Sequence, residues 1–214
     1  MDHGQYRNYV RGFQELTGLP TRNSEEPKKN ARWRRAWIIF EDESGFSLLP
    51  SVKATWAPRG QTPVLAHHFN WKHLSMASAL AFAPDGSDAA LVFSMRAGSF
   101  NDEALIESIS ELRDLLEGDK APLIWDGLTS HRSRVMKAFL KTQRHWLVTE
   151  RLPPYGHDLN PVEQVWGNLK NRELANLCPD TVGEAAVFAD DGLMRIGEDT
   201  RLCFSFLKHC GLSL

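Results

Sequence analysis

The chain has 214 residues, of which 42% are hydrophobic and 24% are charged, and its formal net charge at pH 7 is −2. These values are typical of a soluble globular protein with one sizeable core, and they do not favour a generally basic nucleic-acid-binding protein. No apolar run approaches the ~20 residues of a membrane-spanning helix, and the N-terminal residues lack a signal-peptide stretch, so we expect a cytoplasmic protein with no membrane partner.

The cysteines argue against a disulfide framework and against a structural zinc site. There are three of them, Cys178, Cys203 and Cys210, with no CxxC spacing. Cys203 and Cys210 lie near His209, but a fourth ligand is missing.

The first 36 residues are polar and include a basic run, PKKNARWRR, at 27–35. They lack clear periodicity, and we expect a basic tail or the remnant of an N-terminal region. The apolar run 37–42, WIIFED, predicts a buried strand that ends in acids. A turn at Ser44-Gly45 and two short strands within 53–67 are predicted to follow.

The middle of the chain alternates between strand and helix patterns. Residues 74–83 and 89–95 predict a hairpin around the turn PDGSD. Residues 102–117 predict a helix that Asn101 caps and Gly118 ends. Its apolar face comprises Leu105, Ile106, Ile109, Leu112, Leu115 and Leu116. The run 121–126, APLIWD, predicts a second buried strand that ends in an acid.

The remaining elements are a basic amphipathic helix at about 129–141, a strand at 145–149, a helix from about 161 to 175, and one or two helices beyond 180. In the basic helix we expect Val135, Phe139 and Leu140 to face inward. Three antiparallel strands followed by alternating helices and strands predict an α/β protein, with a mixed sheet and helices on both faces. This is the element order of the ribonuclease-H-like fold.

Three acids occupy comparable places in this arrangement: Asp42 and Asp126 at strand ends, and Glu163 at the start of a helix. The carboxyl ends of strands in such sheets are where ligands bind, and converging carboxylates favour hard divalent cations. Each acid alone has a simpler interpretation. Asp42 is flanked by Glu41 and Glu43, Asp126-Gly127 resembles an ordinary turn, and Glu163 follows Asn160 at the spacing of a capping box. Their joint placement favours a metal site.

Three stretches resemble the signature blocks of the mariner-type DDE transposases, and their residues are most similar to those of the bacterial insertion-sequence branch. They are FEDESGF at 40–46, LIWDGLTSHRS at 123–133 and LPPYGHDLNPVEQVWGNLK at 152–170. WAPRGQTPVL at 56–65 is also similar to that branch, and the resemblance spans roughly residues 33–175. The third block is the most specific, because Pro-Pro-Tyr, Asp-Leu-Asn-Pro and Glu-x-x-Trp occur in order.

The resemblance implies a catalytic triad of Asp42, Asp126 and Glu163 that binds two Mg²⁺ or Mn²⁺ ions. It implies cleavage of transposon ends by water, followed by attack of the freed 3′-OH on target DNA at TA dinucleotides. The partners would be the transposon inverted repeats and target DNA, with a homodimer or pairing with a full-length transposase. The implied domains are a tail at 1–36, a ribonuclease-H-like catalytic domain at 37–176, and a C-terminal helical extension at 177–214 that packs on it.

Basic and aromatic residues around the three acids are candidate DNA contacts. The candidates are His131, Arg132, Arg134, Lys137, Lys141, Trp56, Arg59 and Lys170. Two of them have open alternatives, because His131 suits packing at a helix start and Trp56 suits a half-buried position. We expect Trp166 to anchor its helix in the core.

Relatives carry an N-terminal helix-turn-helix region, whereas only about 36 residues precede the first predicted strand here. The alternative function is therefore a catalytically idle or truncated DNA-binding remnant of a transposase, with a regulatory role. The intact triad favours the enzyme.

Overall fold

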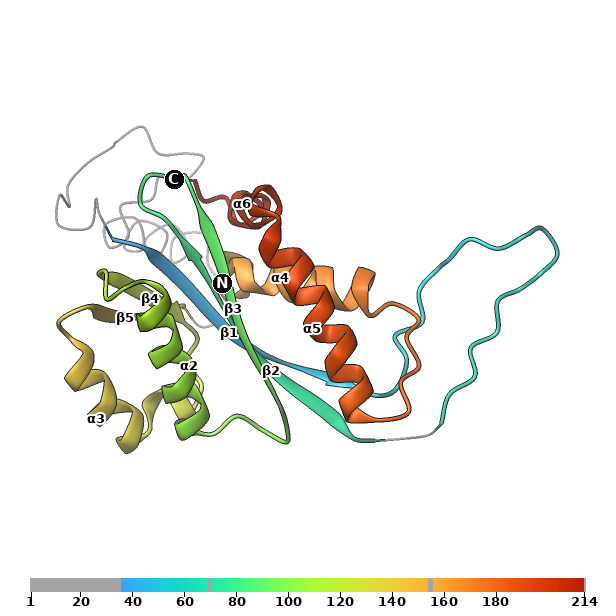
Figure 1. Cartoon of the computed structure of the whole chain (residues 1–214), viewed down its shortest axis with the longest axis horizontal. Helices are drawn as coiled ribbons and strands as arrows, with labels where there is room; N and C mark the ends of the chain where they lie inside the picture. The colour runs from blue at the N-terminus through green and yellow to red at the C-terminus, as the bar shows by residue number, and fades with distance from the viewer. Residues whose placement is uncertain (1–35, 69–70, 154–155, 214) are drawn as a thin grey trace.

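The computed structural model describes residues 36–68, 71–153 and 156–213, and Figure 1 shows one mixed sheet with helices on both sides. The strand order is β3-β2-β1-β4-β5. The strands are β1 Ile38–Ser47, β2 His73–Phe82, β3 Ala89–Ala97, β4 Ala121–Trp125 and β5 Leu147–Arg151. The first three pair antiparallel, whereas β4 pairs parallel with β1 and with β5. The predicted fold class is confirmed.

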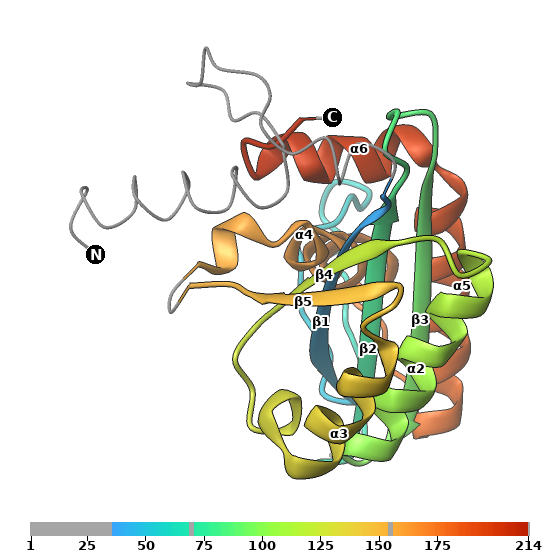
Figure 2. The ribbon, with the colours of Figure 1, turned by 90° about the vertical axis from the view of Figure 1, so that its left-hand side faces the viewer.

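Two groups of helices cover the two faces of the sheet. The longer helices are α2 Asp102–Leu115, α3 Arg134–Gln143, α4 Pro161–Asn168, α5 Val182–Glu198 and α6 Thr200–His209. The short ones are η1 Ser130–Arg132, η2 His157–Leu159 and η3 Leu169–Glu173, a single π-helical turn. Figures 1 and 2 show α2 and α3 on one side of the sheet and α4, α5 and α6 on the other.

The alternation of side chains along β1 decides which acids face which helices. Ile38 and Phe40 belong to the apolar cluster that includes α4, α5 and α6, whereas Ile39 belongs to the cluster on the α2 and α3 side. Successive side chains of a strand point to opposite faces. Asp42 therefore shares the α4 face, and Glu41 and Glu43 share the opposite face.

The helix predicted at 102–117 forms as α2, which begins where expected and ends at Leu115, two residues earlier than predicted. The side chain of Asn101 accepts a hydrogen bond of 3.0 Å from the Ala104 N–H, and Gly118 follows the helix in the left-handed conformation, with φ of 77°. Two predictions of inward-facing residues are wrong. Leu115 at the end of α2 is 52% exposed, and Val135 near the start of α3 is 54% exposed.

The predicted turn at Ser44-Gly45 is wrong, because β1 continues through both residues to Ser47. Ser44 pairs with Met76 and Gly45 with Ser75 in β2, so partner-strand hydrogen bonds outweigh the local preference for a turn. Asp42 is consequently inside β1, and the prediction that it ends this strand is also wrong.

The two short strands predicted within 53–67 do not form. This segment is an exposed loop that extends away from the sheet in Figure 1. Pro58 and Pro63 lack backbone N–H groups and would interrupt any ladder with a neighbouring strand.

The helices predicted beyond residue 180 are α5 and α6, and both contribute buried residues to the cluster around α4. Leu193, Cys203 and Leu207 are examples. The division into domains at residues 36 and 176 stays a prediction, and the proposed N-terminal tail lies outside the described residues apart from Ala36. Within the described part of the chain, no helix combines the length and apolarity that crossing a membrane requires.

Candidate active site

The parallel pairing of β1 with β4 brings Asp42 and Asp126 to the same edge of the sheet. The last pair in that ladder joins Phe40 to Ile124. Asp42 and Asp126 each lie two residues further along. β4 ends at Trp125, so Asp126 begins the following loop, whereas β1 continues beside β2 alone. The two strands separate where the two acids lie.

A buried asparagine fixes the start of α4 on β1. Asn160 is 2% exposed, and its Oδ1 accepts a hydrogen bond of 3.2 Å from the Val162 N–H as the N-cap. Its Nδ2 donates to the backbone carbonyl of Glu41 at 3.1 Å. Pro161 occupies the first helical position. The residue before Asp42 and the first turn of α4 are therefore connected directly, and Glu163 lies in that turn.

Glu163 does not complete a capping box with Asn160. The Asn160 N–H donates to the carbonyl of His157 at 2.9 Å, and Oε1 of Glu163 lies 3.6 Å from Nδ1 of His157. The Glu163 side chain is 40% exposed and lies close enough to Asp42 to be the strongest charge acting on it. The carboxylate of Glu163 is therefore available to a site shared with Asp42.

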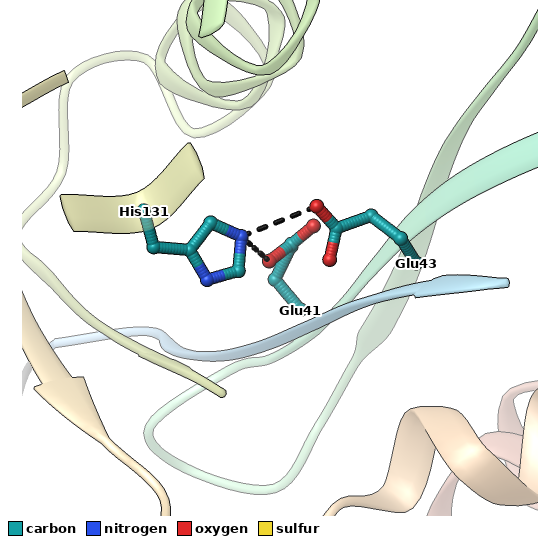
Figure 3. A group of neighbouring side chains, drawn as sticks. All are labelled: Glu41, Glu43 and His131. Carbon is teal, nitrogen blue, oxygen red and sulfur yellow. Dashed lines mark hydrogen bonds and ion pairs between the residues drawn. The ribbon is translucent and has the colours of Figure 1, made fainter. Parts of the chain in front are cut away.

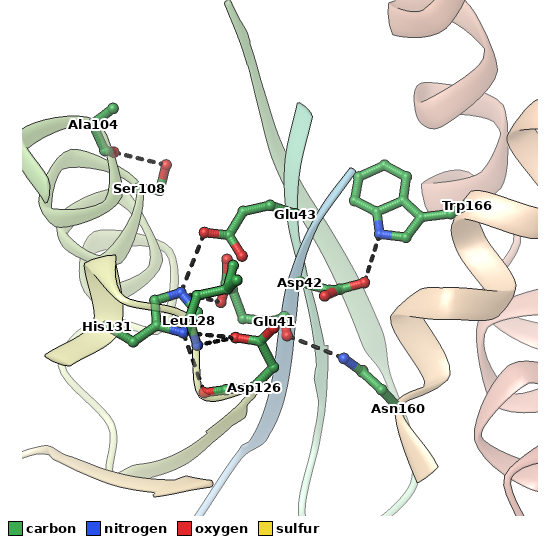
Figure 4. Close-up of polar contacts among 10 residues, drawn as sticks. All are labelled: Glu41, Asp42, Glu43, Ala104, Ser108, Asp126, Leu128, His131, Asn160 and Trp166. Atoms are coloured by element: carbon green, nitrogen blue, oxygen red, sulfur yellow. Dashed lines mark hydrogen bonds and ion pairs between the residues drawn. The ribbon is translucent and has the colours of Figure 1, made fainter. Parts of the chain in front are cut away.

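Asp42 is held by Trp166, which lies one helical turn after Glu163. The indole Nε1–H donates to Oδ2 of Asp42 at 3.0 Å (Figure 4). Burial, followed by repulsion from Glu163 and Glu43, raises the pKa of Asp42 to about 7, although the Trp166 hydrogen bond acts in the opposite direction. A divalent cation next to Asp42 would offset both causes, so these residues fit an oxygen-ligand metal.

Asp126 is held by His131 in the loop that follows β4. Nδ1 of His131 lies 3.1 Å from Oδ1 of Asp126, and the Leu128 N–H donates to the same oxygen at 2.8 Å. Burial alone would raise the pKa of Asp126, but these two hydrogen bonds and the charges of His131 and His157 bring it below its ordinary value. Asp126 is therefore ionised at neutral pH.

His131 also joins two glutamates on the α2 and α3 side of β1 (Figure 3). Its Nε2 lies 3.2 Å from Oε1 of Glu43 and 3.7 Å from Oε2 of Glu41. The imidazole stacks on Trp125 with ring centroids 4.1 Å apart and an interplanar angle of 5°. Burial opposes the charged imidazole, but hydrogen bonds to Asp126 and Glu43 and the charge of Glu41 raise the pKa of His131 to about 10.

Glu41 is the most buried acid of this group. It is 6% exposed, and neither of its carboxylate oxygens has a hydrogen-bond partner. Burial and the charge of Glu43 raise the pKa of Glu41 well above its ordinary value. Among the described residues, Glu41, Glu43 and His131 are also close enough together to hold a metal ion. In this arrangement the protonated His131 ring supplies the positive charge beside the two glutamates. This group was not predicted from the sequence, although the i, i+2 spacing of Glu41 and Glu43 was a signal that they share one face of a strand.

The candidate DNA contacts fall on different surfaces. Those on η1 and α3 are exposed, namely Arg132, Arg134, Lys137 and Lys141. Trp56 and Arg59 lie on the exposed loop. Trp56 is 101% exposed, so its half-buried alternative is wrong. Their binding of DNA stays a prediction.

Lys170 and His131 have different surroundings from the other candidates. Nζ of Lys170 donates to Oγ of Ser44 at 2.6 Å, and burial lowers the pKa of this lysine even though Glu163 and Asp42 favour its charged form. His131 is 5% exposed, with Nε2 beside the carboxylate of Glu43 and Nδ1 beside both the carboxylate and the backbone carbonyl of Asp126. These contacts support the packing alternative for His131, and its contact with DNA stays a prediction.

The mixed sheet, with Asp42 on a central strand and Asp126 directly after its parallel neighbour, has the ribonuclease-H-like fold. The family model described as DDE superfamily endonuclease matches residues 37–182, and the chain belongs to this family. The chain is thus an endonuclease of the DDE class. A search of curated protein sequences found no significant match.

Solved structures of the mariner Mos1 transposase share the fold. The Mos1 paired-end complex with Mg is 14% identical with a TM-score of 0.56, and the match covers 95% of this chain and 68% of that one. The pre-cleavage Mos1 transpososome is 13% identical with a TM-score of 0.54, covering 97% and 72%. The Mos1 strand transfer complex is 14% identical with a TM-score of 0.53, covering 97% and 71%. Assignment to the bacterial insertion-sequence branch stays a prediction.

Proposed function

We propose that the chain is the catalytic domain of a DNA transposase, which cleaves transposon ends and transfers the freed 3′-OH into target DNA at TA dinucleotides. Asp42, Asp126 and Glu163 are the catalytic acids of this proposal. The observation that carries it is the convergence of a strand, a parallel neighbour and a capped helix on Asp42, whose pKa is raised to about 7 by burial and by Glu163 and Glu43.

The three acids would bind two Mg²⁺ or Mn²⁺ ions, which supply activation of the attacking oxygen and stabilisation of the leaving oxygen in phosphodiester chemistry. The protein's own contribution is placement. Asn160 fixes α4 on β1, and so sets Glu163 beside Asp42. Lys170 lies close enough to Glu163 and Asp42 to interact with both charges, and its ammonium group would attract a phosphate of the substrate.

DNA is the proposed partner. The exposed cations of α3 and the fully exposed Trp56 would contact its backbone and bases, respectively. Two copies of the chain, or one copy with a full-length transposase, would be needed to act on two transposon ends. The mariner Mos1 relatives were solved as a paired-end complex and as a strand transfer complex, which supports this part of the proposal by analogy of fold.

The idle-remnant alternative makes a different prediction. A chain that had lost its catalytic role would have no need of buried carboxylates at this edge of the sheet, since removing a carboxylate from water is costly. Glu41 and Asp42 are nevertheless buried there, with pKa values raised chiefly by burial. The presence of this unfavourable arrangement at the proposed site favours the enzyme.

The test uses a supercoiled plasmid that carries the DNA flanking the reading frame. The wild-type chain is incubated with Mn²⁺, and nicks are mapped to the nucleotide. We expect metal-dependent nicks at the repeat ends, and loss of these nicks in Asp126→Asn and in Glu163→Gln. Asp158→Asn is the matched control, because Asp158 is an exposed acid in η2, close in sequence to Glu163. DNA binding without metal-dependent cleavage in the wild type would establish the remnant instead.

A further inference from the structure

Each of the two aspartates has an aromatic ring nitrogen close to one carboxylate oxygen: Trp166 Nε1–H donates to Oδ2 of Asp42 at 3.0 Å, and His131 Nδ1 lies 3.1 Å from Oδ1 of Asp126 and 3.2 Å from its backbone carbonyl oxygen. Figure 4 shows Trp166 directed at Asp42 and His131 directed at Asp126. We propose that Trp166 and His131 are positioning residues, which hold one oxygen of each aspartate so that the carboxylate keeps a fixed orientation toward a divalent cation. This inference rests on the proposed function, because it assigns the second layer of contacts around the same site.

Trp166 is suited to this role by its burial and by its chemistry. It is 3% exposed, and it is on the same helix as Glu163, three residues later. Residues three apart on a helix are neighbours on its surface. A single helix therefore carries one catalytic acid and fixes the orientation of another. The indole N–H is neutral and only donates, so it orients an ionised carboxylate without occupying the place of a cation.

His131 is held on more than one side. One face of the ring stacks on Trp125, Nε2 lies 3.2 Å from Glu43, and Nδ1 lies 3.1 Å from Asp126. The ring therefore has little freedom to rotate, and Nδ1 stays beside Asp126, close to both its Oδ1 and its backbone carbonyl oxygen. Glu43 orients His131, and His131 orients Asp126. This chain of contacts connects the α2 and α3 face of β1 to the catalytic edge.

The expected magnitude follows from other metal sites. Outer contacts that orient a ligand contribute about 10–100-fold to metal affinity or activity when they are removed. A side chain that contributes only packing would instead lower the stability of the fold and leave metal affinity unchanged. Measuring both metal affinity and stability therefore distinguishes a positioning role from a packing role.

The experiment measures Mn²⁺ binding by the full chain without DNA, from the electron paramagnetic resonance signal of free Mn²⁺. Trp166→Phe keeps the apolar bulk and removes the N–H. Trp146→Phe is the matched control. Trp146 is 2% exposed, and its indole donates to Oε1 of Gln143 at 2.9 Å, away from the three acids. We expect Trp166→Phe to weaken Mn²⁺ binding about 10–100-fold and Trp146→Phe to leave it unchanged. Equal Mn²⁺ affinity in the two variants would overturn the role of Trp166.

His131 is tested by a conservative pair. His131→Phe keeps a ring that can stack on Trp125 but cannot donate to Asp126, whereas His131→Gln retains an N–H donor. We expect weaker Mn²⁺ binding in His131→Phe and partial recovery in His131→Gln. Wild-type affinity in His131→Phe, or equal weakening in both variants, would overturn the role of His131. If His131→Phe does not fold, His131→Gln is compared with His131→Ala on the same terms.

A reference variant separates this inference from the proposed function. Asp126→Asn removes a proposed ligand and should weaken Mn²⁺ binding at least as much as either positioning variant. If Asp126→Asn binds Mn²⁺ like the wild type, the proposed metal site itself is wrong. If Asp126→Asn loses binding while Trp166→Phe and His131→Phe retain it, the site stands and only the positioning roles fail.

Discussion

Trp166 and Asp42 are joined by a hydrogen bond of 3.0 Å although 124 positions separate them in the sequence. Asn160, in the same segment as Trp166, donates to the carbonyl of Glu41, the residue before Asp42. Glu41 and Asp42, two consecutive residues of β1, are therefore each contacted by a side chain of the α4 segment. Asn160 caps the start of the helix, and Trp166 lies in its second turn. The orientation of α4 on the sheet, and with it that of Glu163, depends on both contacts.

The raised pKa of Asp42 predicts how stability depends on pH in the absence of divalent metal. The carboxyl has a pKa of about 7 in the folded chain, chiefly through burial and the charge of Glu163. Between an ordinary unfolded value of about 4 and this folded value, the folded state keeps a proton that the unfolded state has lost, so stability falls as pH rises. Above the folded pKa, Asp42 is ionised in both states, and the folded state bears the full cost of the buried, repelled carboxylate.

Asp42→Asn removes this penalty. In EDTA we expect the variant to be more stable than the wild type by on the order of a few kcal/mol at about pH 8, and by much less at about pH 4. Urea unfolding at both pH values checks this expectation. Adding Mg²⁺ should stabilise the wild type and not the variant. A stability difference that does not change with pH would contradict the assigned cause.

Asn160→Ala should destabilise the fold more than loss of an ordinary helix cap. A cap contributes about 0.5–2 kcal/mol, and the buried carbonyl of Glu41 would also lose its donor at a cost of about 1–3 kcal/mol. Thr181→Ala provides the comparison, because the Thr181 hydroxyl caps α5 through the Glu184 N–H at 3.1 Å and is exposed. Chemical denaturation should show the larger loss for Asn160→Ala. Similar losses would indicate that the contact with Glu41 contributes little.

Two glycines inside helices should respond oppositely to alanine. A Cβ on Gly192 of α5 would lie 2.8 Å from Cδ1 of Leu169 and 2.9 Å from Cβ of Glu173, so Gly192→Ala should cost about 1–3 kcal/mol through overpacking. A Cβ on Gly167 of α4 would have no atom within 4 Å. Gly167→Ala should stabilise the fold by about 0.5–1 kcal/mol. Thermal unfolding of both variants measures the signs, and two destabilised variants would contradict this packing.

The exposed cations of α3 predict how strongly the affinity for DNA depends on salt concentration. Arg134, Lys137 and Lys141 are spaced i, i+3 and i+7, which places them on one face of the helix, and all three are exposed. Removing a phosphate contact lowers the slope of log affinity against log salt by about 1. We expect this change for Lys137→Ala and for Lys141→Ala in duplex binding measured over a salt series. Lys208→Ala on α6, on the opposite side of the sheet, should leave the slope unchanged.

The order of elements was predictable because it depends on local patterns. The apolar runs before Asp42 and Asp126, the face of α2 and the Asn160-Pro161 start of α4 each act within a few residues. The path of β1 through Ser44-Gly45 was not predictable, because pairing with β2 overrides a sequence that favours a turn. The strands expected within 53–67 do not form, because a segment with strand-like residues becomes a strand only when a neighbouring strand pairs with it.

The three candidate acids were chosen from their motifs, and their role stays a prediction; the contacts around them could not be predicted from the sequence. The sequence gives no indication that His131 lies between Asp126 and Glu43, because those contacts depend on how the loop after β4 folds over β1. It likewise indicates Trp166 as a buried residue without indicating its hydrogen bond to Asp42. The hydrogen bond from the buried Trp166 to the Asp42 carboxylate is visible only in the three-dimensional structure.

The attachment of α4 to β1 also determines when the site can arise during folding. The acids come from positions 42, 126 and 163, and closing chain segments of this length carries an entropic cost that local helix formation does not. The contacts made by Asn160 and Trp166 exist only once α4 lies against β1. The carboxylates of Asp42 and Glu163 can therefore lie beside each other only after α4 has packed on β1. A chain that ends before α4 lacks Glu163 and the contacts of Asn160 and Trp166 with β1, so the proposed site is complete only when α4 has packed on β1.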